Sequence, residues 1–308
     1  MIREAELRRQ AARWNVDPMV VDLDYSLGWF VAALYQANEK AARLYFKGGT
    51  CLRKCYFGEY RFSEDLDFTA ALWLDPERLL EWVERAARRS ADIDGPDFEV
   101  ASPRMETLRD EYGSETYQVR VYYRGPLRWG GSPRAIRIDV TRDEKMVLPP
   151  VRRHLIHPYS DAELLSSVQI PCYTLPEVLA EKIRAVAGQR RFAVSRDLYD
   201  IHRLLQSDVA VEEVLPLLPA KFEARGVDMA ALSVRQGQIF YWRSRRRVTV
   251  EFTAELREQT KAAIARAFAL LEKGQRPPPI ENRAKCRDCS LEEICLPREV
   301  LLLSREQN

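Results

Sequence analysis

The chain has 308 residues, of which 46% are hydrophobic and 31% are charged. This balance allows a sizeable core beneath a charged surface, and it excludes intrinsic disorder, collagen-like repeats and small disulfide scaffolds. Lys and Arg together number 48 against 46 Asp and Glu, which gives a net charge of +2. A protein that binds nucleic acid through bulk charge alone is therefore excluded, and any site for a polyanion must come from where the charges lie.

No targeting segment is visible. The sequence is charged from position 3 and starts without the apolar stretch of a signal peptide. The longest apolar run without a charge, residues 25–38, is too short to span a bilayer. We therefore expect a soluble, cytoplasmic protein without a membrane partner, and its six cysteines predict a reducing compartment and no disulfide framework.

Strands and helices are mixed over the first 160 residues. Asp17 and Pro18 start a helix whose apolar residues recur every three or four positions. A short apolar strand, 44–46, then runs into Lys47-Gly48-Gly49-Thr50 and a further helix. The remaining predicted elements are a helix over 77–90, strands within 98–124, a hairpin turn at 126–133 and a strand over 136–140.

Helices dominate beyond about residue 160. Thr174 and Glu177 have the spacing of a capping box, and the helix that they open is predicted to run to about Gly188. Ser195 is predicted to cap the next helix. Further helices are predicted at about 211–218 and 252–273, followed by a Pro-rich linker at 274–279.

These patterns predict an α+β protein in three parts. Residues 1–160 would form an α/β domain with a mixed sheet, and residues 161–273 a helical domain that closes a cleft against it. Residues 274–308 would form a linker and a cysteine-bearing tail. The length is typical of two domains with an appendage.

The strongest candidate site begins at Gly48-Gly49-Thr50. A glycine pair after a strand lets the backbone approach a ligand closely, and the helix N-terminus that follows presents free N–H groups to a phosphate. On the next strand, Asp65 and Asp67 point to the same side, away from the core. Two carboxylates held on one face repel each other unless a cation joins them, and such hard oxygen ligands suit Mg²⁺.

A third carboxylate lies on a later strand. Ile136, Ile138 and Val140 form one face of that strand, so Asp139 faces the other way. Asp139 is therefore the third candidate metal ligand, although a solvated Asp at a sheet edge would have the same pattern.

Four motifs in chain order resemble one family. Lys47-Gly48-Gly49-Thr50 and the stretch from Arg61 to Phe68 are similar to the active-site signature of the AbiEii/AbiGii nucleotidyltransferase toxins, members of the DNA polymerase β-like nucleotidyltransferase superfamily. The resemblance continues at 175–183 and 195–201. The four motifs cover most of residues 40–205, which is much more specific than any one of them.

The resemblance implies a polymerase β-like domain and chemistry at the α-phosphate of an NTP. Asp65, Asp67 and Asp139 would hold two Mg²⁺ ions, and Asp139 would help to orient or deprotonate the attacking hydroxyl. The residues implied to bind the nucleotide are Lys47, Gly48, Gly49, Thr50, Ser63, Lys182 and Arg196.

The helical motifs add further candidate catalytic residues. Lys182 lies at the edge of an apolar stripe, where its stem can cover apolar surface while its ammonium group reaches into a cleft. Asp197 and Asp200 share a helix face, and the resemblance puts one of them at the active site, with Asp197 slightly favoured. A solvated lysine and a carboxylate that stabilises a helix N-terminus are the alternatives.

The resemblance also implies partners. The acceptor of the nucleoside monophosphate is thought to be the tRNA 3′ end in some members of the family and is unsettled in others. The enzyme is the toxin of a toxin–antitoxin or phage-defence pair, so a separately encoded antitoxin is expected. A basic stretch at 236–247, which includes Tyr241, Trp242 and Arg243 to Arg247 without an acidic residue, is a candidate RNA contact or a solvated face.

A cysteine cluster near the end of the sequence departs from this family. Cys286, Cys289 and Cys295 have the spacing C-x₂-C-x₅-C, which resembles the iron–sulfur cysteines of RecB-type and CRISPR-associated nucleases and also suits Zn²⁺. Three free thiols are the alternative. The candidates for a fourth ligand are Cys172, Cys51, Cys55, His154, His157 and His202.

Two other functions fit parts of the sequence. A catalytically inactive regulator that binds nucleotide or RNA would keep the fold, but binding alone does not require the Asp65/Asp67 pair with Lys182. A metal-dependent nuclease would suit the cysteine cluster, but no further nuclease motif of carboxylates and lysine is present.

Overall fold

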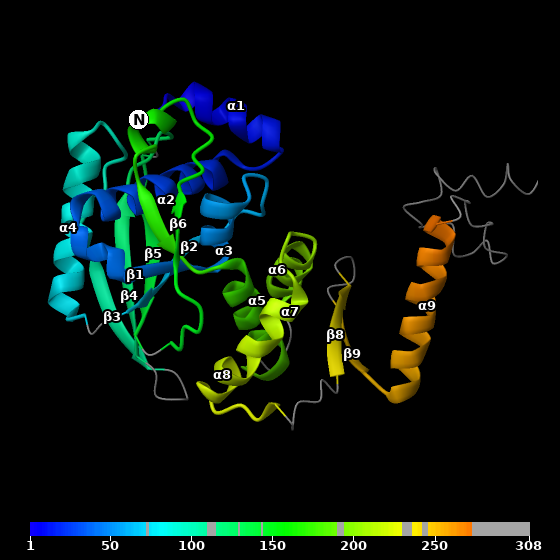
Figure 1. Ribbon diagram of the computed structural model, residues 1–308. Coiled ribbons are helices and arrows are strands. Elements are labelled where there is room, and N and C mark those ends of the chain that lie inside the picture. Colours follow the sequence, from blue (N-terminus) through cyan, green and yellow to red (C-terminus); the bar gives the residue numbers. More distant parts are fainter. Residues whose placement is uncertain are drawn as a thin grey trace, which may run out of the picture. The chain divides into compact units, whose positions relative to one another are not determined.

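The computed structural model describes residues 1–71, 74–109, 115–128, 130–142, 144–189, 194–229, 236–241 and 246–272 (Figure 1). The chain divides into two compact units, Met1–Ser233 and Val234–Asn308. None of the helices in these ranges is both long and apolar enough to cross a membrane.

A mixed seven-stranded sheet organises the first unit, which confirms the predicted α+β class. Its strand order is β3-β4-β5-β2-β1-β7-β6, with β2 parallel to β5, β1 parallel to β7 and the other neighbours antiparallel. The strands are β1 (Leu44–Lys47), β2 (Asp65–Ala70), β3 (Arg104–Arg109), β4 (Glu115–Tyr123), β5 (Arg134–Thr141), β6 (Val151–His154) and β7 (Gln169–Cys172).

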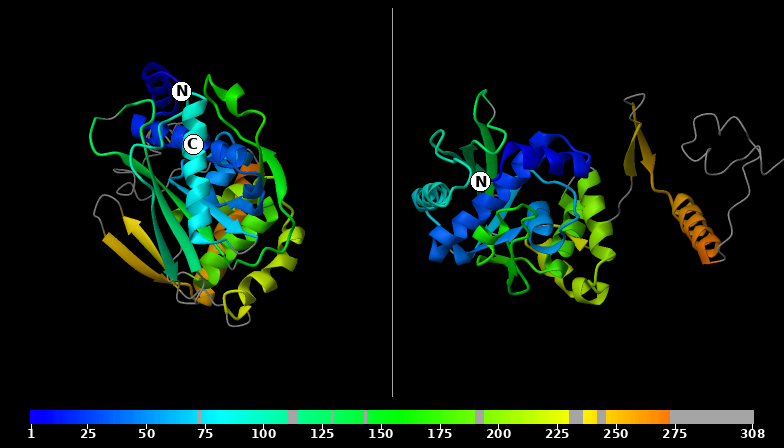
Figure 2. Two further views of the ribbon diagram at one scale, coloured as in Figure 1. Left: turned by 90° about the vertical axis from the view of Figure 1, so that its left-hand side faces the viewer. Right: turned by 90° about the horizontal axis from the view of Figure 1, so that it is seen from above.

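One face of this sheet is covered by helices α2 (Pro18–Ala37) and α4 (Pro76–Asp92), as Figures 1 and 2 show. The Asp17 side chain caps α2 by accepting a hydrogen bond from the Met19 N–H at 2.7 Å. Apolar side chains of both helices pack on the alternate strand residues that point towards them, such as Val119 and Ile138, and form the first core. Helix α1 (Glu4–Trp14) packs on α2.

The helices that follow β7 in this unit form a second core. They are α5 (Leu175–Arg184), which continues as a π-helical turn (Ala185–Gln189), α6 (Ser195–Leu205), α7 (Val211–Val214) and α8 (Leu218–Glu223). Leu52 and Tyr60, which come before residue 160, pack in this core with Val178 and Phe222, which come after it. The helical part and the sheet therefore belong to one compact unit.

Two details differ from the sequence pattern at the helix starts. Thr174 caps α5 by accepting from the Glu177 N–H at 3.3 Å, but the Glu177 carboxylate does not return to the cap; it accepts from the N–H groups of Val147 and Leu148. Ser195 is the first residue of α6 instead of its cap, and no side chain caps that helix. At Glu177, the tertiary contact with residues 147 and 148 therefore replaces the local hydrogen bond of the capping box.

Between β1 and β2, the chain forms a short helix α3 (Gly48–Cys51) and a π-helical turn (Leu52–Tyr56).

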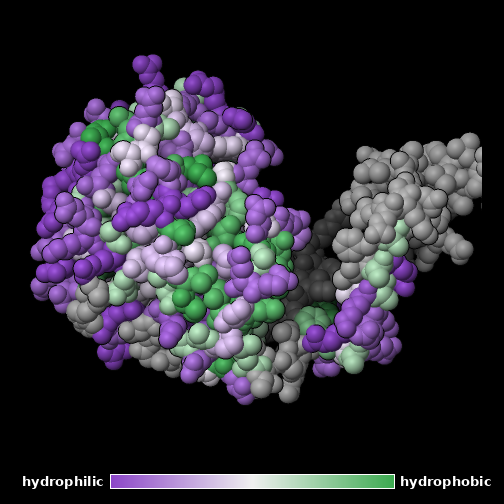
Figure 3. All heavy atoms as spheres, in the orientation of Figure 1, coloured by the Kyte–Doolittle hydropathy of each residue, from purple (hydrophilic) through white to green (hydrophobic). Residues whose placement is uncertain are grey.

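The surface of the helical part, α5 to α8, carries exposed apolar side chains, and Figure 3 shows hydrophobic residues among hydrophilic ones on its visible face. Those on α6 to α7 and just beyond are Leu198, Leu205, Val211 and Leu215.

The second unit contains an antiparallel hairpin and a helix. Strand β8 (Gln236–Tyr241) pairs with β9 (Arg246–Glu251), and helix α9 (Ala254–Glu272) follows. The predicted helix over 252–273 thus agrees closely with α9. Cys286, Cys289 and Cys295 lie outside the described residues, as do Trp242, Arg243 and Arg245 of the basic stretch.

Candidate active site

Three carboxylates meet on the open face of the sheet. Asp65 and Asp67 alternate with buried residues on β2, and the parallel register places Asp67 directly opposite Asp139 of β5. Since paired residues on neighbouring strands point to the same side, the three side chains share one face. The structure thus brings together the carboxylates that the sequence proposed as metal ligands.

The surroundings of Asp67 and Asp139 disfavour their ionised form. The pKa of Asp67 is raised to about 6, mainly by burial; the neighbouring charges of Asp139 and Asp65 contribute to the rise, and Lys47 and Lys182 oppose it. Burial also raises the pKa of Asp139, against a 3.0 Å hydrogen bond from the Gln118 amide. A divalent cation would offset this repulsion, and three oxygen donors on one face fit Mg²⁺.

The glycine turn packs directly against this cluster. Gly48 has a φ of 76°, in the left-handed region that favours glycine, and a Cβ at this position would overlap the Asp67 carboxylate. A Cβ at Gly49 would lie 2.7 Å from the Arg61 guanidinium and 3.0 Å from the Ser63 hydroxyl. The two glycines therefore allow the backbone to approach the Asp67 carboxylate and the Ser63 hydroxyl closely; the predicted approach to a ligand stays a prediction.

Two neighbours of the glycines are held by internal contacts. The Thr50 hydroxyl donates to the Asp65 carbonyl at 2.5 Å, which ties the turn to β2. Lys47 is buried, forms an ion pair with Glu144 and lies 3.9 Å from a Glu181 oxygen. Burial acts against its charge, but the two carboxylates outweigh burial and raise the Lys47 pKa. Lys47 is therefore a charged group fixed beneath the site.

Lys182 stands between two buried carboxylates. Its Nζ lies 2.8 Å from an Asp197 oxygen and 2.9 Å from an Asp200 oxygen. Arg61 donates two hydrogen bonds of 2.7 Å to Asp200, and the Tyr60 hydroxyl donates a third of 2.9 Å. Burial raises the Asp200 pKa, but Arg61 and Lys182 lower it more, so the net shift is downward. In this structure Asp197 and Asp200 therefore position Lys182 and Arg61.

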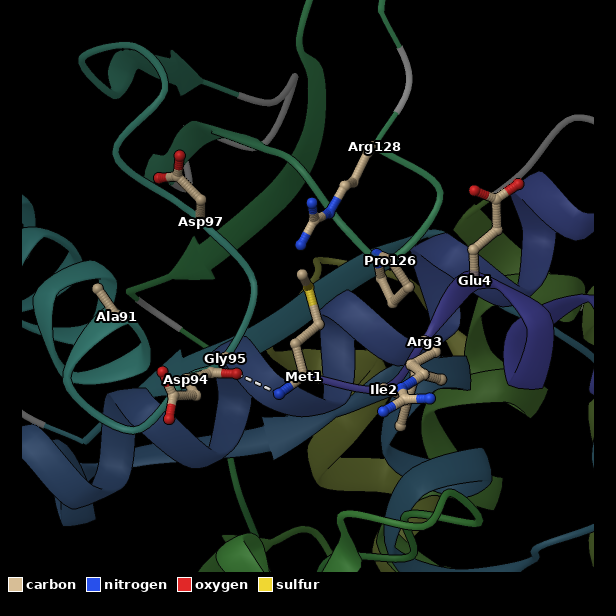
Figure 4. A pocket seen from close by; sticks show the side chains of 10 residues that line it. All are labelled: Met1, Ile2, Arg3, Glu4, Ala91, Asp94, Gly95, Asp97, Pro126 and Arg128. Carbon is tan, nitrogen blue, oxygen red and sulfur yellow. Dashed lines mark hydrogen bonds between the residues drawn. The ribbon is translucent and has the colours of Figure 1, made fainter.

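Ser63 and Arg196 are the remaining predicted site residues. Ser63 lines a pocket of about 570 Å³ together with Phe62, Asp65 and Arg137. Arg196 is exposed on the first turn of α6. A second cavity, of about 610 Å³, lies around Met1, Asp94 and Arg128 and contains none of the predicted site residues (Figure 4).

Sequence reasoning assigned no role to several residues that shape the site. Arg137 forms an ion pair with Asp65, and its Nε lies 3.5 Å from an Asp139 oxygen. The signal that could have found it is its position two residues before Asp139 on the same face of β5. Gln118 and Glu144 had no such signal, because only pairing between distant segments brings them to the site.

Cys172, a predicted fourth ligand for the tail cysteines, lies beside two other buried cysteines. The thiols of Cys51, Cys55 and Cys172 are buried and lie within 4.8 Å of one another. All three also belong to the first core, where thiols pack as small apolar groups. Whether the tail cysteines take Cys172 as a fourth ligand stays a prediction.

A mixed sheet with carboxylates on two parallel strands, beside a glycine turn that opens a helix, defines a nucleotidyltransferase of the polymerase β-like type. The chain belongs to the nucleotidyl transferase AbiEii toxin family of type IV toxin–antitoxin systems, whose family model matches residues 29–284.

A shorter stretch is similar to a different group of proteins. It is 46% identical over 68 residues to a CRISPR-associated exonuclease Cas4/endonuclease Cas1 fusion of Geobacter sulfurreducens, and 38% identical over 71 residues to a CRISPR-associated exonuclease Cas4 of Rhodospirillum rubrum. These matches cover 22% and 23% of this chain and only 12% and 21% of the relatives. They concern a segment and do not describe the chain as a whole.

Proposed function

We propose that the protein is an Mg²⁺-dependent nucleotidyltransferase that moves a nucleoside monophosphate from an NTP to a hydroxyl of an acceptor. The observation that carries this proposal is the position of Asp67 opposite Asp139 and beside Asp65, where burial is the main cause that raises the pKa of both Asp67 and Asp139 and neighbouring carboxylates add to the shift. Closely spaced carboxylates of this kind can hold the metal ions of phosphoryl-transfer chemistry, whereas nucleotide binding alone does not require them.

Each of the site residues would have a separate role in the reaction. Asp65 and Asp67 would hold Mg²⁺ against the triphosphate, and Asp139 would orient or deprotonate the acceptor hydroxyl. The hydroxyl oxygen forms a bond to the α-phosphorus as the bond to pyrophosphate breaks. Backbone N–H groups of the turn at 48–50 and the Ser63 hydroxyl would bind phosphates, and Lys182 would neutralise the leaving pyrophosphate. Arg196, exposed on α6, would meet the outer phosphates.

The biological setting follows from the family. We propose that the chain is the toxin of a two-gene system in the cytoplasm, inhibited by a separately encoded antitoxin, with tRNA as the first acceptor to test. The helical part, which supplies Lys182, would close over the nucleotide. The C-x₂-C-x₅-C spacing of Cys286, Cys289 and Cys295 supports a Zn²⁺ or iron–sulfur site there, which anaerobic purification with metal analysis would test.

The function is tested by incubating the protein with each α-labelled NTP in turn, Mg²⁺ and total RNA or protein. Asp67→Asn is the inactive variant, and Asp92→Asn, an exposed carboxylate on α4, is the matched control. We expect label in the acceptor with the wild type and Asp92→Asn only. Transfer that survives Asp67→Asn would contradict the assignment, and cleavage of RNA without transfer would favour a nuclease.

A further inference from the structure

Three arginines lie side by side on the open face of the sheet. The strand registers place Arg104 of β3 opposite Arg120 of β4, and Arg120 opposite Arg137 of β5. Arg137 in turn is opposite Asp65 of β2. All three side chains are exposed, and we refer to Arg104, Arg120 and Arg137 as the arginine row.

The arginine row leads from the carboxylates to solvent. Neighbouring strands lie about 4.8 Å apart, so the row extends roughly 10 Å from Arg137 to Arg104. Strand β3 is the edge strand of the sheet, and β2 carries Asp65 at the inner end of the row. A small acceptor needs no such path, whereas a long one must leave the site along some surface.

The charges of the row are only partly compensated. Like charges directly opposite on neighbouring strands are destabilising, and Arg120 has an arginine on either side. Arg137 is neutralised by Asp65 and approached by Asp139. Among the described residues, no carboxylate lies within ion-pair distance of Arg120 or Arg104. The sheet thus keeps two repelling cations that an external polyanion would neutralise.

An aromatic ring and a pocket complete this surface. Tyr122 is half-buried, points to the same face as Arg120, and has its ring centroid 6.0 Å from the Arg104 guanidinium. The pocket of about 570 Å³ joins Arg120 and Arg137 to Asp65, and its volume suits a single nucleotide. Arginines next to an aromatic ring are the combination that binds unpaired nucleic acid, because phosphates contact the cations and bases stack on the ring.

We propose that the arginine row and Tyr122 bind a single-stranded nucleic acid whose end occupies the pocket beside Asp65. The assignment of this surface as the path of the acceptor rests on the proposed nucleotide transfer. The binding of nucleic acid to this surface does not depend on that function. The acceptor strand runs from the pocket over Arg120 and leaves the sheet at Arg104, and the base next to the terminal nucleotide stacks on Tyr122.

The test measures binding of a fluorescent 12-nucleotide unpaired RNA to the full chain, without NTP or Mg²⁺, between 50 and 200 mM salt. The variant Arg104→Ala/Arg120→Ala is compared with Arg78→Ala/Arg88→Ala, which removes two exposed arginines from α4 on the covered side of the sheet. Each phosphate contact contributes about 0.7 to the slope of log K against log salt, so the slope should fall by about 1.4 in the first variant only. Equal slopes in both variants would overturn the proposal.

Tyr122 supplies a second readout. Tyr122→Ala should weaken binding about tenfold, while Tyr122→Phe keeps the ring and should bind like the wild type. Tyr122→Ala with unchanged affinity would refute the stacking contact.

The two proposals fail separately. If the wild type binds RNA through the row but transfers no label, the proposed function fails and the binding surface stands. If the wild type transfers label and Arg104→Ala/Arg120→Ala leaves the KM for the acceptor unchanged, the row is not the acceptor path.

Discussion

Replacing Asp67 by Asn should stabilise the metal-free protein while it abolishes transfer. Asn has nearly the same shape and stays beneath Gly48, but it carries no charge to bury. The pKa of Asp67 is raised from 3.8 to about 6, and about 2 units at 1.36 kcal/mol each correspond to about 3 kcal/mol. This is the free energy by which the fold disfavours the ionised carboxylate.

The sign of the pH dependence follows from the raised pKa. The folded state holds the Asp67 proton more tightly than the unfolded state does. The raised pKa therefore contributes to the free energy of unfolding of the wild type in full below about pH 4, and this contribution is lost as pH rises through about 6. Asn resembles the protonated form at every pH. The two proteins should therefore be equally stable near pH 4, and the variant should be more stable by up to about 3 kcal/mol at pH 8.

Urea denaturation in EDTA at pH 4, 6 and 8 measures this difference, with Asp92→Asn as the control that should show none. Adding Mg²⁺ at pH 8 should stabilise the wild type and leave Asp67→Asn unchanged. A variant that is no more stable than the wild type at pH 8 would refute the argument that burial and neighbouring carboxylates disfavour the charge of Asp67.

Three other substitutions test the contacts around the site. Gly48→Ala should reduce transfer by more than about 100-fold with the fold retained in circular dichroism, because the added Cβ displaces the Asp67 carboxylate. Lys182→Met leaves the buried Asp197 and Asp200 with less compensation and should lower the free energy of unfolding by about 3 kcal/mol, measured by urea denaturation. Glu177→Ala leaves two backbone N–H groups without their acceptor and removes the closest carboxylate of the buried Lys221, and should cost about 3–5 kcal/mol; a Tm equal to that of the wild type would contradict this.

Local patterns were sufficient to predict most of the elements. The alternation around Asp65 and Asp67 predicted β2, and Asp17 with Pro18 predicted the start of α2. These features depend on neighbours within a few residues, which a sequence displays directly. For the capping box, the sequence predicted the Thr174 cap correctly. It did not predict that the Glu177 carboxylate accepts hydrogen bonds from the N–H groups of Val147 and Leu148 instead of returning to the cap.

The sequence by itself determined the class of element at each motif, the face on which each carboxylate lies and the family signature. Only the tertiary structure decided that Asp139 stands opposite Asp67, that Arg61 and Lys182 share Asp200, and that the arginine row leads away from Asp65. The reason is physical: side-chain direction along a strand follows from a period of two residues, whereas the register between distant strands depends on hydrogen bonds and burial that only the assembled sheet provides. The near-neutral net charge could not reveal this segregation of acids and arginines, since it counts charges without placing them.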